Sequence, residues 1–169
     1  MTRKILICHE RITTQLPCTL LDQLAPRACA FLWSLAGSDA QFAVNHAIWT
    51  GPELSCPLPA ETLPSGVDRS PLPLENASSF PRAGDLGLVW LRSGSMRGLP
   101  PGDFFDIGIF YDEGARLLMP FGWIKASIAA TITPADLHIA QEFAREIRQN
   151  GGCRLRICRA PTTASAQPA

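Results

Sequence analysis

Short apolar segments recur along this chain, separated by turns rich in glycine and proline, and only two segments have the spacing of an amphipathic helix. The 169 residues include 13 glycines and 15 prolines, a combined share above the roughly 12% of average usage. Glycine and proline interrupt helices but suit the turns between short strands. The pattern therefore argues against a helical bundle and predicts a mainly β protein.

The strand segments are recognised by their apolar, partly β-branched composition between turn residues. Residues 85–92 and 104–111 are the clearest of them, and residues 116–119 follow a turn at 112–114, so we expect them to pair back on 104–111 as a hairpin. Further strands are expected at residues 3–8, 11–21, 41–50, 125–133 and 153–159.

Two segments predict helices. Pro26 opens the first, over residues 25–36, because proline at the first helical position loses no hydrogen bond, and Gly37 ends it. The second, over residues 134–149, follows an oxygen cap at Thr133 and ends at a glycine pair.

The order of these elements favours a closed, mostly antiparallel β-barrel capped by two α-helices, because closure removes the exposed sheet edges. Residues 53–75 are proline-rich with interspersed leucines, which predicts a long ordered loop over the barrel. We expect one domain over residues 1–159 and a disordered C-terminal tail over 160–169, which is small and polar.

The charge balance argues against nucleic acid as a partner. Fifteen basic residues balance fifteen acidic ones, whereas nucleic-acid binding requires a basic excess. Charged residues make up only 18% of the chain, so little electrostatic repulsion opposes self-association, and we expect a homo-oligomer. No apolar run is long enough to span a bilayer or to act as an export signal, which predicts a cytoplasmic protein without membrane contact.

The six cysteines are scattered and form no C-x-x-C pair. Together with only three histidines, this spacing predicts reduced thiols and no metal site. The sequence contains no phosphate-binding loop, dinucleotide fingerprint or serine elbow, so we expect no cofactor.

The segment that leads into the first helix resembles the cyclophilins. In that family a strand ends in an acidic residue and an Ala-Pro-basic step opens the first helix, as at Asp22 and Ala25-Pro26-Arg27 here. The chain resembles a bacterial family of cyclophilin-like proteins of unknown function more closely. The similarity covers roughly residues 3–158 and is carried by His46-Ala47-Ile48-Trp49 with Gly51, Glu75-Asn76-Ala77 with Pro81, Gly84-Asp85-Leu86, and Ile107-Gly108-Ile109-Phe110-Tyr111.

The resemblance implies a cyclophilin-like barrel but not the cyclophilin reaction. Prolyl isomerases of this fold carry Phe-His-Arg and Gln-Gly-Gly-Asp segments after the first helix, and their arginine polarises the prolyl amide. Residues 41–49 contain neither segment and no arginine. We therefore expect no classical isomerase activity.

His46 and Trp49 are the candidate site residues of the segment 41–50. Imidazole titrates near neutral pH, so His46 suits general acid–base work at a pocket mouth, although a histidine beside Phe42 and Val44 also fits a hydrogen-bonded core position. In a regular strand Trp49 lies on the opposite face, so the two would not line one pocket without a bulge.

Four further residues are predicted to surround a ligand beside His46. Glu75 and Asn76 can orient a polar ligand or cap a turn. Tyr111, the only tyrosine, can close a pocket or make a structural hydrogen bond. Arg116 can bind a carboxylate or pair with Asp112 or Glu113.

These features support a hypothesis of small-molecule binding. We expect a site between residues 53–75 and the strand of His46, taking a small polar metabolite such as a cyclic amide or a carboxylate, with or without chemical transformation. Two alternatives stay open: a non-catalytic binding or assembly module, and a residual peptidyl-prolyl isomerase.

Overall fold

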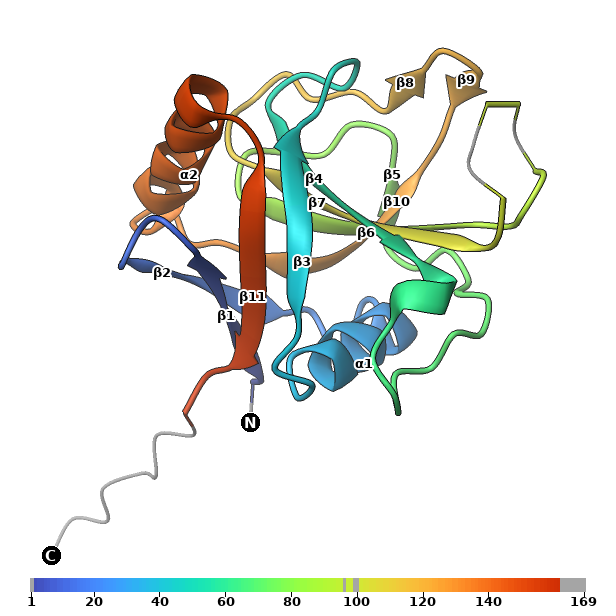
Figure 1. Ribbon diagram of the computed structural model, residues 1–169, viewed down its shortest axis with the longest axis horizontal. Coiled ribbons are helices and arrows are strands. Elements are labelled where there is room, and N and C mark those ends of the chain that lie inside the picture. Colours follow the sequence, from blue (N-terminus) through green and yellow to red (C-terminus); the bar gives the residue numbers. More distant parts are fainter. Residues whose placement is uncertain (1, 96, 99–100, 162–169) are drawn as a thin grey trace, which may run out of the picture.

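The strands of the computed structural model form one large antiparallel sheet that curves until its ends meet (Figure 1). The structure describes residues 2–95, 97–98 and 101–161, so residues 162–169 of the expected tail lie outside the described residues. The strands are Lys4–His9 (β1), Gln15–Leu20 (β2), Gln41–His46 (β3), Glu53–Pro59 (β4), Ala77–Ser78 (β5), Asp85–Leu91 (β6), Phe104–Phe110 (β7), Leu118–Met119 (β8), Gly122–Trp123 (β9), Ala126–Thr131 (β10) and Cys153–Arg159 (β11).

Closure of the sheet confirms the expected barrel. The strands follow the order β2-β1-β11-β3-β4-β7-β6-β10, and β10 pairs again with β2, through Ala130 opposite Leu20 and Thr131 opposite Thr19. All these pairings are antiparallel. The short strand β5 adds to β10, and β8 pairs only with β9.

Two helices, Pro26–Leu35 (α1) and Leu137–Asn150 (α2), lie at opposite ends of the barrel (Figure 1). Each buries an apolar stripe. From α1, Phe31 stacks on Phe105 of β7 with ring centroids 4.6 Å apart. The helices therefore close the barrel core at its ends, as the sequence pattern predicts.

Strand β4 corrects the expectation of a long loop over residues 53–75. Its first part, Glu53–Pro59, is a strand. The chain then forms a one-turn 3-10 helix at Ala60–Thr62 and continues without regular structure until β5. Pro57 and Pro59 lack the N–H group that a central strand donates. They are tolerated because β3 pairs only with Leu54 and Ser55, whereas β7 pairs with the whole of β4.

The hairpin expected from residues 116–119 is also different in the structure. Leu118 and Met119 pair with Gly122 and Trp123 and not with β7. The segment that contains β8 and β9 instead lies over the outside of the sheet, where Ala115 and Leu117 pack with Val89, Phe110 and Ala126 in a second, smaller core. The protein therefore has apolar packing on both faces of β6 and β7.

Candidate functional site

A cavity of about 280 Å³ lies on the outer face of strands β4, β7 and β6. Side chains alternate along these strands, so Leu54, Phe105 and Ile107 face the barrel core, whereas Glu53 and Asp106 face the cavity. The loop 47–50 and the segment 117–124 form its walls. We call this space the outer cavity.

The outer cavity has two carboxyl groups in otherwise mainly apolar surroundings. Glu53 is 7% exposed, and its Oε2 atom accepts a hydrogen bond from the Thr50 hydroxyl. The Ser55 hydroxyl donates to both carboxylate oxygens of Asp106, at 2.8 and 3.0 Å. Each acid is thus held by one hydroxyl group from the start of β4 or the loop before it.

The surroundings of the two carboxyl groups raise the pKa of each. Burial and, to a smaller extent, the charge of Glu53 raise the pKa of Asp106 to about 7, against the opposing effect of the hydrogen bonds from the Ser55 hydroxyl and the Cys56 backbone. Burial also raises the pKa of Glu53, opposed by the hydrogen bond from Thr50. Asp106 therefore exchanges a proton close to neutral pH, a property typical of functional sites.

Gly108 provides the space that Glu53 occupies. It lies opposite Ser55 on β4 and opposite Gly87 on β6. A Cβ atom at residue 108 would overlap Oε1 of Glu53 and lie 2.9 Å from the Phe110 ring. The glycine thus allows the carboxyl group to lie against the backbone of β7.

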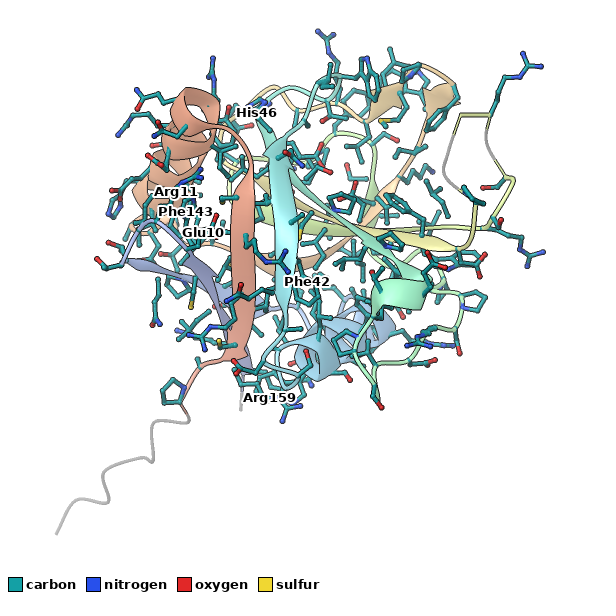
Figure 2. The ribbon with its side chains drawn as sticks, viewed as in Figure 1. Glu10, Arg11, Phe42, His46, Phe143 and Arg159 are labelled. Atoms are coloured by element: carbon teal, nitrogen blue, oxygen red, sulfur yellow. The ribbon has the colours of Figure 1, made fainter. Side chains whose placement is uncertain are left out.

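The structure brings His46 and Tyr111 together. Figure 2 shows His46 at the end of β3 that lies far from Phe42. The Tyr111 hydroxyl donates to Nε2 of His46 at 2.8 Å, and Nδ1 of His46 donates to the Ala47 carbonyl at 2.8 Å. His46 lines the outer cavity, Tyr111 does not, and both ring nitrogens of His46 already have protein partners. The structural interpretation of Tyr111 therefore fits this geometry.

Trp49 lines the same cavity as His46. The strand β3 ends at His46, so Trp49 belongs to the following loop and is not fixed by strand alternation. This explains how both side chains reach one cavity without a bulge.

Glu75 caps helix α1 and does not line the outer cavity. Its Oε2 atom accepts hydrogen bonds from the backbone N–H groups of Arg27 and Ala28, at 2.9 and 3.1 Å. These N–H groups have no partner within the helix, and a negative charge there is favourable to the helix dipole. Glu75 thus stabilises α1 from a segment distant in sequence.

Replacing Glu75 by alanine is expected to lower the free energy of unfolding by about 1 kcal/mol, because two N–H groups lose their acceptor. Glu75→Gln keeps an acceptor oxygen and should lose less than half of that amount. Urea denaturation of both variants measures the difference. Unchanged stability in Glu75→Ala would contradict the capping role.

Asn76 and Arg116 also lie outside the lining of the outer cavity. Asn76 adopts a positive φ of 47° and donates from Nδ2 to the Ile128 carbonyl at 2.9 Å, so it holds a turn against β10. Arg116 is exposed, and within the described residues its side chain makes neither a hydrogen bond nor an ion pair. Of the five residues predicted for the site, only His46 lines this cavity.

A second histidine contact lies away from the outer cavity, beside α2, where Figure 2 shows Arg11 and Phe143. Nδ1 of His9 accepts the Arg11 backbone N–H, so Nε2 carries the hydrogen and donates toward Sγ of Cys153 at 3.3 Å. Burial raises the pKa of the Cys153 thiol to about 11. The thiol therefore stays protonated, and the pair is a structural contact and not an activated nucleophile.

Within residues 2–95, 97–98 and 101–161, no three His, Cys, Asp or Glu side chains are placed to hold a metal ion together. Neither described helix has the length and hydrophobicity that a membrane crossing requires.

The comparisons with known proteins identify a family and a fold. Residues 8–159 match the model of a family described as "Protein of unknown function (DUF3830)". No curated protein matches the chain. Solved structures that resemble the chain include McbB in complex with tryptophan, with 14% identity and a TM-score of 0.63, and the Mimivirus cyclophilin, with 12% identity and a TM-score of 0.53.

These likenesses differ in the share of each chain that they cover. The chain aligns over 97% of its length with McbB but spans only 46% of the McbB chain, whereas it covers 93% of the Mimivirus cyclophilin. At such low identity the likenesses establish the fold alone, which is cyclophilin-like.

Proposed function

We propose that this chain, which belongs to the DUF3830 family of proteins of unknown function, binds a small molecule in the outer cavity. The observation that carries the proposal is the pair of carboxyl groups, Glu53 and Asp106, on the wall of a cavity with mainly apolar lining. Pockets of this kind bind an apolar ligand body and orient it through a few polar groups.

The lining favours one of the two ligand classes inferred from the sequence. Within the part of the chain that the structure describes, no lysine or arginine, Arg116 included, lines the outer cavity. Two carboxyl groups repel a ligand carboxylate, but they accept hydrogen bonds from ligand N–H groups. We therefore favour a ligand that presents N–H groups, a class that includes cyclic amides and amines.

A structural neighbour supports binding on this scaffold. McbB, whose fold is similar, has been solved in complex with tryptophan, a small molecule that carries an ammonium group, a carboxylate and an indole ring. The likeness adds support for small-molecule binding, and the ligand of the present chain is argued from its own cavity.

The outer cavity also contains a side chain suited to catalysing a reaction of the ligand, Asp106. Since the pKa of Asp106 is about 7, this carboxyl group is present both as acid and as base at neutral pH. A group of this kind transfers protons to and from a bound molecule efficiently. Asp106 is the residue that we propose for such a step.

A thermal-shift screen of cyclic amides, dicarboxylates and peptides tests the proposal, because a ligand that binds only the folded state raises its melting temperature. We expect cyclic amides to stabilise the wild-type protein and to lose this effect in Glu53→Gln. The variant Glu61→Gln, which changes an exposed carboxylate, serves as the control. Equal stabilisation of wild type and Glu53→Gln by every hit would contradict the proposal.

Prolyl isomerisation is expected to be absent. Because no arginine is among the described residues that line the outer cavity, the group that polarises the prolyl amide in the isomerases is missing there, and the rotation barrier of about 18–20 kcal/mol should stay unchanged. A proline-peptide assay should give the uncatalysed rate at all protein concentrations. Turnover that depends on protein and disappears in a cavity variant would instead support the isomerase alternative.

Exposed apolar side chains favour an assembly role as the second candidate. Ile48 is 81% exposed, Trp49 55%, Phe80 63% and Trp123 53%, and the rings of Phe80 and Trp123 lie 5.3 Å apart. Self-association through these residues would explain their exposure. Sedimentation of the wild type and of Trp123→Ser tests this: a wild-type oligomer that dissociates in the variant supports it, and a wild-type monomer contradicts it.

A further inference from the structure

We infer that the ligand of the outer cavity is an organic cation, an amine whose ammonium group binds between Glu53 and Asp106 while its apolar body contacts the surrounding walls. This inference rests on the proposed function, since it names the class of ligand that the same cavity takes.

Glu53 presents a free acceptor to the cavity. It is 7% exposed and lines the cavity, and its Oε2 atom has the Thr50 hydroxyl as partner. No described residue donates a hydrogen bond to Oε1, and this atom is not completely buried, so it is accessible from the cavity. A ligand that donates hydrogen bonds into the cavity would satisfy it.

The charges of the outer cavity are unbalanced. Among the described residues, the titratable groups that line it are His46, Glu53 and Asp106, and no lysine or arginine is part of the lining. Both ring nitrogens of His46 are engaged by Tyr111 and Ala47. The protein therefore provides two acids without a matching cation. A neutral amide would offer donors but would leave this charge uncompensated, whereas an ammonium group supplies both.

The rest of the lining does not suit a bare metal ion as the natural occupant. Outside the acids and their hydroxyl partners, much of the wall is apolar or aromatic, including Val89, Leu91, Phe104, Phe110, Leu117 and Phe121. A metal ion prefers oxygen ligands and water to such walls. The cavity holds about 280 Å³, and at about 30 Å³ for each water-sized volume this is room for about nine non-hydrogen atoms.

Three probes of nearly the same shape test the inference: 2-phenylethylamine, 2-phenylethanol and phenylacetate, which are cationic, neutral and anionic. Isothermal titration calorimetry at about pH 8 should show the amine binding at least about tenfold more tightly than the alcohol, with phenylacetate weakest. Glu53→Gln and Asp106→Asn should each weaken the amine by about tenfold or more and change the alcohol by less than about twofold.

The pH dependence provides a readout that a merely structural role of the acids would not give. Between about pH 8 and pH 6 the amine should bind about tenfold more weakly, because protonation of Asp106 removes the negative charge that attracts it. This dependence should vanish in Asp106→Asn. A dependence that persists in Asp106→Asn would mean that another group causes it and would overturn the role of Asp106.

The outcomes separate this inference from the proposed function. If the alcohol binds as tightly as the amine and a cyclic amide stabilises the protein, the cation inference is wrong and the proposed function stands. If the amine fails to bind at millimolar concentration, the cation inference is wrong whatever the screen shows. Glu61→Gln should leave the amine affinity unchanged, and a loss there as large as in Glu53→Gln would mean general surface electrostatics and would also overturn it.

Discussion

Replacing Asp106 by asparagine is expected to stabilise the protein at about pH 8, by about 2 kcal/mol, and to have almost no effect at about pH 4. The asparagine side chain keeps an oxygen that accepts from the Ser55 hydroxyl but has no charge to bury. Most single substitutions destabilise a protein. A gain here would therefore mark Asp106 as a residue kept for a reason other than stability.

The sign follows from the direction of the pKa shift. The pKa of Asp106 is raised from 3.8 to about 7 on folding, so the unfolded chain gives up this proton at a lower pH than the folded protein. Stability from this group is present below the unfolded pKa and is lost as the pH rises through about 7. A shift of this size corresponds to about 4 kcal/mol at most, and because Asp106 lines the cavity, water there reduces the effect to about half.

Urea denaturation at several pH values checks this prediction. The difference between Asp106→Asn and wild type should grow between about pH 4 and pH 7 and then level off. Glu61→Gln, on an exposed residue, should show no such trend. A destabilised Asp106→Asn at every pH would mean that its hydrogen bonds with Ser55 outweigh the burial of its charge.

The second large effect is expected from Gly108→Ala, which should lower the free energy of unfolding by about 2 kcal/mol. The added Cβ atom would overlap Oε1 of Glu53 and lie 2.9 and 3.0 Å from two atoms of the Phe110 ring. Phe110 is 1% exposed and packed in the second core, so its ring has little room to move. The Glu53 carboxyl group must move as well, so ligand binding should weaken together with stability.

A matched glycine controls for the general effect of adding a methyl group. The Cβ atom of Gly37→Ala would meet the guanidinium group of Arg159, which ends an exposed side chain. Moving that group gives up only its hydrogen bond to the Trp33 carbonyl and its contact with the Trp33 ring, so we expect a loss of about 1 kcal/mol at most. Similar losses at residues 37 and 108 in chemical denaturation would contradict the packing argument.

The barrel could be predicted from sequence because its determinants are local. Strands such as β6 and β7 are apolar segments between turns, and Pro26 and Gly37 delimit α1. Strand β4 was not predictable in the same way. The two prolines of β4 argue against a strand. They are compatible with one because β3 pairs only with the first part of β4, and the sequence does not show this long-range pairing.

The acids of the outer cavity escaped prediction for a similar reason. Asp106 and Gly108 alternate with Phe105, Ile107 and Ile109, which is the pattern of a strand with one face toward solvent. The segment that covers this face, residues 115–124, is joined to it only by the fold. The alternation of large apolar residues with Asp106 and Gly108 predicts that Asp106 lies on the outer face of a strand, but it does not predict that this face is covered.

The remaining site predictions show the same limit. His46 and Tyr111 were each recognised, but only the pairing of β4 with both β3 and β7 explains why they touch. Glu75 was weighed as a ligand group or a turn cap, and the structure places it at the start of a helix 47 residues away in sequence. A distant cap of this kind has no local sequence signal.

Side chains along β4, β7 and β6 point alternately into the barrel core and toward the outer cavity. This arrangement affects how proteins of this family can diversify. Residues that face the barrel core stabilise the fold, and their immediate neighbours in sequence line the outer cavity. Outward positions that are neither packed in the second core, as Val89 and Phe110 are, nor tightly enclosed, as Gly108 is, can therefore accumulate mutations without disturbing the barrel. In this way the lining of the cavity can change on one inherited scaffold.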